Sequence, residues 1–147
     1  FPSLTVGQNL RIAAQKKFTG KRMNDKVDEL MGMLGITGIA DSTSGSLSHG
    51  QQQWLEIGMA LASEPKLLLL DEPAAGLGPE ETESTAELIQ RIHDNGLTVL
   101  FIEHDMAFVR MLAQSVTVMH LGRKFMEGSM DEVSSNRAVQ DIYLGRN

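Results

Sequence analysis

A short apolar run in the sequence ends on two carboxylates that could bind a metal ion and activate water. Four leucines at positions 67–70 are followed directly by Asp71, Glu72 and Pro73. A buried parallel strand delivers its last residues to the carboxyl edge of the sheet, where ligands of open α/β folds bind. There one carboxylate can hold Mg²⁺ and a second can deprotonate an attacking water molecule. The same residues could also form a strand followed by a solvated acidic turn.

A second group of polar residues lies at the predicted start of a helix. Ser48 is a favourable N-cap residue, and Gln51, three residues later, completes a capping box. Because Gly50 has no side chain, a phosphate group could approach the helix start closely. There the unpaired N–H groups and the Ser48 hydroxyl could bind it. Locally, a well-formed helix start and a phosphate site are equally supported.

The elements that must position these residues can be predicted from apolar spacing. The first third of the chain is predicted to be helical over 5–17, 24–34 and 48–63, with a loop over 37–45. The character of the sequence then changes, because the next apolar run has no polar face. We expect such a strand to lie inside a parallel sheet that is covered on both sides.

The rest of the chain is predicted to alternate strands and helices. The apolar runs 66–71 and 97–102 flank a helix that starts at Pro79 and stops at Gly96, which indicates a βαβ unit. The remaining prediction is a helix over 105–113, a hairpin of 115–120 and 124–127, and short helices from Met130 and from Arg137.

Composition argues against several classes of function. The 147 residues include no cysteine, which removes disulfides, thiolate metal sites and cysteine nucleophiles. The net charge is -6 and the basic residues are scattered, so we expect no nucleic-acid partner. No apolar run approaches the roughly 18 residues that span a bilayer. The first residues show neither the charged start nor the apolar core of a signal peptide.

The order and spacing of three motifs closely resemble the ABC ATPase family. A Leu-Ser-x-Gly-Gln sequence opens a helix, a strand then ends in Asp-Glu-Pro, and His104 follows the next strand. The resemblance covers essentially the whole chain. It implies an α/β fold, namely the C-terminal part of a P-loop NTPase nucleotide-binding domain. Residues 1–63 would form its helical subdomain with the signature motif, and 64–147 its α/β core.

The resemblance also assigns roles to individual residues. The signature motif, which contacts the ATP of a partner subunit, would contain Ser48, Gly50 and Gln51. Asp71 would help to hold Mg²⁺ at the end of the Walker B strand, and Glu72 would be the general base. His104 is similar to the switch histidine that contacts the terminal phosphate.

Two departures from the family pattern concern neighbouring positions. His49 stands where the signature usually has glycine, so its side chain is expected to point away from the nucleotide. Gly78 stands where many members carry aspartate, which puts in doubt the contact between subunits that this aspartate makes. His49, His93 and His120 match no family role and are predicted to be surface residues.

The phosphate-binding loop of the family is absent from the sequence. That loop reads G-x-x-x-x-G-K-[ST]. The only Gly-Lys pair, Gly20-Lys21, is followed by Arg22. Residues 1–6 resemble the stretch just after the Q-loop glutamine of the family. We therefore expect a chain truncated at its N-terminus, with the Walker A portion missing and little or no ATPase activity of its own.

The residues in and around these motifs are similar to those of the ATPase subunits of importers in the branched-chain amino acid and urea group. The signature running into Trp54 is closest to the urea branch, and residues 142–145 resemble that group's C-terminal end. The resemblance implies ATP and Mg²⁺ as cofactors and a peripheral location on the cytoplasmic face of the membrane. The implied partners are a second ABC ATPase subunit, transmembrane permease subunits and, indirectly, a solute-binding protein. A soluble non-transport ABC ATPase fragment and a non-catalytic interaction module remain as alternatives.

Overall fold

The computed structural model describes residues 1–143 and divides the chain into two compact units. The first unit comprises Phe1–Glu103, and the second begins at His104. The predicted boundary near residue 63, between a helical subdomain and an α/β core, remains a prediction. Leu144 and Gly145, in the segment likened to the C-terminal end of the importer group, lie outside the described residues.

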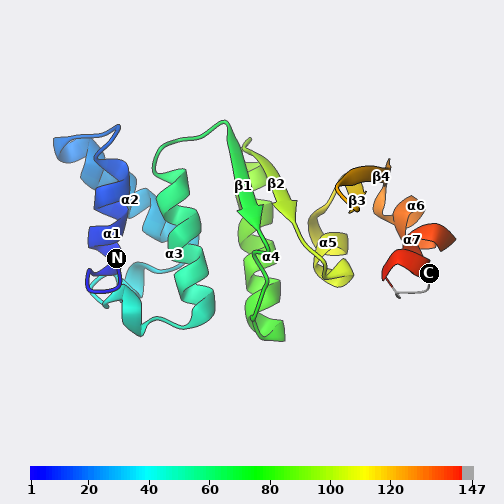
Figure 1. Ribbon diagram of the computed structural model, residues 1–147. Coiled ribbons are helices and arrows are strands. Elements are labelled where there is room, and N and C mark those ends of the chain that lie inside the picture. The colour runs from blue at the N-terminus through cyan, green and yellow to red at the C-terminus, as the bar shows by residue number, and fades with distance from the viewer. Residues whose placement is uncertain (144–147) are drawn as a thin grey trace. The chain divides into compact units, whose positions relative to one another are not determined.

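Three helices form the first part of the first unit, and they pack against one another (Figure 1). They are α1 (Val6–Ala14), α2 (Gly20–Leu34) and α3 (His49–Leu61), and two short 3-10 turns, Thr37–Ile39 and Ser44–Ser46, fill the predicted loop. Their shared core consists of fully buried aliphatic side chains: Val6, Leu10, Val27, Leu30, Leu34, Leu55 and Ile57. The predicted helices are confirmed, although α2 begins four residues earlier than the expected residue 24.

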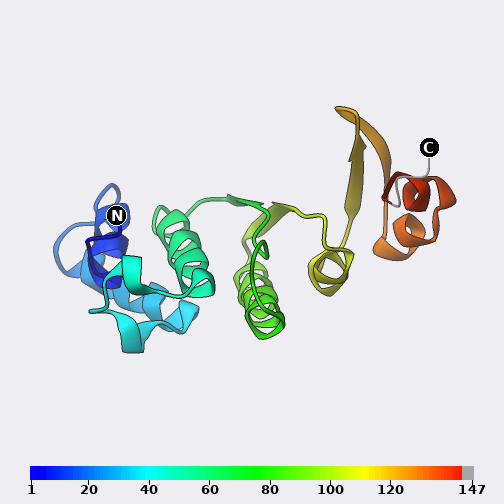
Figure 2. The ribbon, with the colours of Figure 1, turned by 60° about the horizontal axis from the view of Figure 1, so that its bottom comes forward.

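The predicted βαβ unit is confirmed in the second part of the first unit. Strand β1 (Leu67–Asp71) is followed by α4 (Pro79–Asp94) and then by β2 (Thr98–Ile102). The two strands pair in parallel, with Leu67 opposite Thr98 and Asp71 opposite Ile102. Helix α4 lies against one face of the strand pair (Figures 1 and 2).

The expectation that β1 is covered on both faces is wrong in this structure. Leu68 and Leu70 are buried on the side of α4, whereas the opposite face of the sheet is exposed. This exposed sheet face consists of Leu67, Leu69, Leu100 and Ile102, whose side chains are 46%, 64%, 57% and 65% accessible. A run of leucines shows that both faces are apolar, but it does not show whether a second layer is present to bury them.

The second unit contains the remaining predicted elements. They are α5 (Met106–Leu112), β3 (Val116–His120), β4 (Arg123–Gly128), α6 (Met130–Ser135) and α7 (Arg137–Tyr143). The strands β3 and β4 form the predicted antiparallel hairpin. The small core of the second unit consists of the buried side chains of Val118, Val133 and Val139. Over residues 1–143, none of the helices combines the length and apolarity that a bilayer span requires.

Candidate nucleotide site

The N-terminus of α3 has the geometry that the sequence predicts. The Ser48 hydroxyl accepts a hydrogen bond from the Gln51 N–H at 3.2 Å, and the Gln51 side-chain oxygen accepts from the Ser48 N–H at 3.1 Å. This reciprocal pair is the predicted capping box. Ser48 is exposed while Gly50 is buried. The helix start is thus well formed and its serine is accessible from outside.

The same helix start also contacts the segment that follows β1. The Ser48 hydroxyl donates a hydrogen bond to Glu81 Oε1 at 3.1 Å. His49 Nε2 lies 3.1 Å from the carbonyl oxygen of Ala75, so the tautomer protonated at Nε2 donates to it. These contacts join α3 to the loop and the first turn of α4. Neither was predicted from the sequence.

The three histidines predicted to lie on the surface differ in their surroundings. His49 is exposed, as expected, although its ring is hydrogen-bonded. His93 and His120 are half-buried, so they lie at the surface with part of each ring covered. His93 lies near the end of α4, where its Nδ1 is 3.2 Å from the Leu97 carbonyl oxygen, and the ring of His120 packs edge-on against Phe125.

The two predicted acidic site residues lie side by side at the carboxyl end of β1. Asp71 is the last residue of the strand, Glu72 follows it, and both are exposed. Glu72 has a φ of 46°, in the left-handed region that non-glycine residues rarely adopt. Its N–H donates to the Ile102 carbonyl at 2.9 Å, and its carbonyl accepts from Ala75 N–H at 3.0 Å. The backbone of Glu72 is therefore held by the sheet and by a turn.

Glu103 contributes to the same loop and was missed by the sequence reasoning. Its Oε1 accepts a hydrogen bond from the Ala74 N–H at 2.8 Å, so a side chain after β2 fixes the turn after β1. The parallel register, which places Ile102 beside Asp71, could have indicated that Glu103 lies near this turn. The sequence does not show in which direction the Glu103 side chain points, so this hydrogen bond could not be predicted.

His104 is the first residue of the second unit and is exposed, two residues beyond the end of β2. Its role toward a terminal phosphate stays a prediction.

The carboxylates fit a magnesium ion that is held mainly by other ligands. Within residues 1–143, no three His, Cys, Asp or Glu side chains are grouped so as to hold a metal ion by themselves. Mg²⁺ keeps several waters and is commonly bound by one or two carboxylates together with substrate phosphates. The exposed Asp71 at the sheet edge suits that mode of binding.

Comparison with known proteins identifies the class to which this fold and these motifs belong. The family model described as ABC transporter matches residues 1–75, which include the α3 start and the end of β1. The chain belongs to the ABC transporter family.

Individual relatives include ATP-binding proteins of amino acid importers. The chain is 38% identical over 140 residues to a methionine import ATP-binding protein of Pasteurella multocida, with 94% of the chain and 41% of the relative covered. It is 34% identical to a branched-chain amino acid transport ATP-binding protein of Salmonella typhimurium, with coverages of 99% and 64%. The chain thus spans less than two thirds of the length of these relatives.

Solved structures of ATP-binding cassettes share the fold. One cassette of an ABC transporter superposes with a TM-score of 0.86 at 29% identity, covering 97% of this chain and 63% of that chain. A component of the cbiONQ ABC transporter complex from Clostridium perfringens gives 0.85 at 29% identity, covering 98% and 58%. The fold is that of part of an ABC nucleotide-binding domain.

Proposed function

We propose that this chain is the signature-helix and Walker B part of the ATPase subunit of an ABC importer. The observation that carries the proposal is the occurrence of two functional features in the first unit. An exposed serine at a capped helix start and two exposed carboxylates at a parallel sheet edge occur in one cassette fold. The first arrangement suits contact with phosphate, and the second suits Mg²⁺ and activation of water.

Each residue group has a separate task in the proposed reaction. Glu72, held by its backbone, accepts a proton from the water that attacks the terminal phosphate of ATP, and Asp71 helps to hold Mg²⁺, which neutralises phosphate charge when bound. His104 contacts the terminal phosphate. Ser48, Gly50 and Gln51 contact the ATP of the partner subunit, where the serine hydroxyl and the helix N–H groups donate to phosphate oxygens.

The proposed setting is a membrane complex. A second ABC ATPase subunit, identical or different, completes each nucleotide site, and the pair docks peripherally on transmembrane permease subunits at the cytoplasmic face of the membrane. A solute-binding protein outside the membrane delivers the solute indirectly. The importer relatives named above support this setting.

The proposed solute is small and polar, with urea as the first choice and branched-chain amino acids as the second. The urea assignment depends on the signature sequence running into Trp54, whereas the relatives include importers for methionine and branched-chain amino acids.

Deletion of the gene, followed by uptake assays with radiolabelled urea, leucine and methionine, tests the import function. Loss of urea uptake alone supports the first choice, and loss of leucine uptake supports the second. Unchanged uptake of all three solutes would contradict the proposed importer role and favour a non-transport ATPase or a non-catalytic module.

The purified 147-residue chain is expected to show little or no ATP hydrolysis. Its sequence offers no Gly-Lys-Ser/Thr loop to grip the β- and γ-phosphates beside Asp71 and Glu72. Phosphate release from Mg-ATP, with Glu72→Gln as the background control, measures this directly. Robust turnover that is abolished in the control would contradict the expectation.

A further inference from the structure

Glu81 is the one acidic side chain that the described residues place in hydrogen-bonding distance of the signature serine. It lies in the first turn of α4 and is half-buried. Its Oε1 accepts a hydrogen bond from the Ser48 hydroxyl at 3.1 Å, and its Oε2 lies 3.5 Å from the Gly78 N–H. One carboxylate therefore joins the start of α3 to the start of α4.

The carboxylate fills the space that the absence of a side chain at Gly50 leaves open. A Cβ atom built on Gly50 would lie 3.0 Å from both Cδ and Oε1 of Glu81, which is closer than ordinary van der Waals contact. An anion thus lies over the buried glycine and accepts from the exposed serine. Both residues are part of the surface that the proposed function assigns to the phosphate of a partner's ATP.

We propose that Glu81 acts as an internal substitute for phosphate, occupying the Ser48 hydroxyl and the space over Gly50 until an incoming phosphate displaces it. The carboxylate and a phosphate oxygen compete for the same hydroxyl donor and for the same positive end of the α3 dipole. Two anions in this small volume would repel each other. Binding of the partner's nucleotide therefore requires the Ser48–Glu81 hydrogen bond to break.

This inference rests on the proposed phosphate-binding role of the signature, and it adds a regulatory contact that the role does not require. His49 limits how far the two segments can separate, because its ring is bonded to the Ala75 carbonyl and packs against Gly76. We expect the displacement to involve the Glu81 side chain rather than separation of α3 from α4.

The test is a titration of the full chain with inorganic phosphate, followed by the amide NMR signals of Gly50 and Gln51 at constant ionic strength. Glu81→Gln removes the charge but keeps a side chain that can complete the cap at Gly78. It should lower the dissociation constant for phosphate roughly three- to tenfold relative to the wild type, because a charge-assisted competitor becomes a neutral one. Glu80→Gln is the matched control, since it removes the same charge one residue earlier and should change the constant less than about twofold.

The outcomes separate this inference from the proposed function. Equal phosphate binding by the wild type and Glu81→Gln, or an equal gain in Glu81→Gln and Glu80→Gln, would overturn the role of Glu81 alone. No shift at Gly50 and Gln51 in any variant would contradict the phosphate-binding role of the signature and, with it, this inference. Glu81→Asp, which keeps the charge but shortens the side chain, should act in the same direction as Glu81→Gln and serves if the latter does not fold.

Discussion

The helical region and the β1–β2 sheet of the first unit contain similar apolar residues, but the helices bury them whereas one face of the sheet exposes them. In α1 to α3 the aliphatic side chains are enclosed, and even a Cβ on Gly58 would overlap a methyl group of Leu34. In the sheet, Leu69 and Ile102 are 64% and 65% exposed. The three helices bury their apolar side chains against one another. One face of the sheet, in contrast, exposes the kind of apolar surface that parallel sheets normally bury.

The largest expected effect contrasts two leucines from these regions. Leu10→Ala removes a fully buried side chain from the helical core and should lower the free energy of unfolding by about 2–5 kcal/mol. Leu69→Ala on the exposed sheet face should change it by less than about 0.5 kcal/mol. Urea denaturation measures both. A large decrease in the free energy of unfolding for Leu69→Ala would show that this face is covered in solution, which would contradict the contrast between the two regions.

A smaller effect is expected from added volume in the helical core. Gly58→Val places methyl groups where Leu34 and Leu10 already lie, and it should destabilise the protein by about 1–3 kcal/mol. Gly32→Val in α2 is the control, because a Cβ there meets nothing within 4 Å and the residue is exposed. Thermal unfolding of the two variants should differ clearly, and equal melting temperatures would show that the helical core is looser than described.

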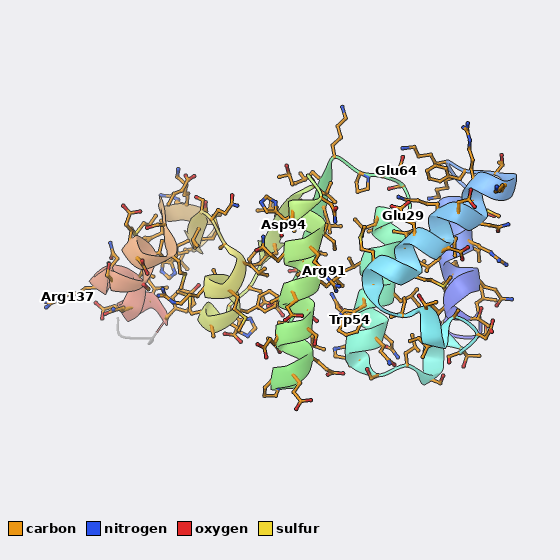
Figure 3. All side chains as sticks on the ribbon, turned by 180° about the vertical axis from the view of Figure 1, so that it is seen from behind. Glu29, Trp54, Glu64, Arg91, Asp94 and Arg137 are labelled. Carbon is orange, nitrogen blue, oxygen red and sulfur yellow. The ribbon has the colours of Figure 1, made fainter. Side chains whose placement is uncertain are left out.

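The third prediction concerns the link between the two regions. Trp54 on α3 points toward α4, and its indole N–H donates to the buried Thr85 hydroxyl at 2.8 Å (Figure 3). Trp54→Phe should cost about 1–2 kcal/mol, because the hydrogen bond is lost while the hydroxyl stays buried.

A double-mutant cycle with Thr85→Val isolates this hydrogen bond. The double variant should lose less stability than the sum of the single variants, since both partners are then apolar. Strict additivity would mean that the two side chains do not interact in solution.

The smallest expected effect is a pH dependence within the helical region. Lys17 donates a 2.6 Å hydrogen bond to Glu64, and this contact, together with the charge of Lys26, holds the pKa of Glu64 below its ordinary value of 4.5. Glu29 and Glu64 lie near each other in Figure 3, and Lys26 contacts both of them. Because the folded-state pKa is lowered, the contribution is complete above the ordinary carboxyl pKa and is lost as the pH falls through the lowered value.

Melting temperatures of the wild type and Glu64→Gln between pH 7 and pH 3 check this sign. Their difference should be small, since the pair is exposed, and should shrink toward acidic pH. Glu87→Gln, on the exposed side of α4, should show no such convergence. A difference that grows as the pH falls would contradict the assignment.

Features that depend on local sequence patterns could be predicted, because each capping motif, apolar run or helix start is recognised from a few neighbouring residues. The Ser48–Gln51 capping box and the βαβ unit are examples, and both are confirmed. The covering of β1 could not be predicted, since leucines on two faces do not show whether a second layer is present. The Ser48–Glu81 contact joins residues 33 positions apart and depends on how α3 meets α4. Glu103 was missed because its role depends on one rotamer.

The most direct test of the proposed function is the ATP turnover of the proposed transporter complex, purified with Ser48→Arg in this chain. The arginine side chain would block the signature from the partner's nucleotide, so we predict that turnover falls by about 10²-fold or more. Ser46→Arg, at an exposed position just before the motif, is the control and should retain near wild-type turnover. Unchanged turnover in Ser48→Arg would contradict the signature assignment.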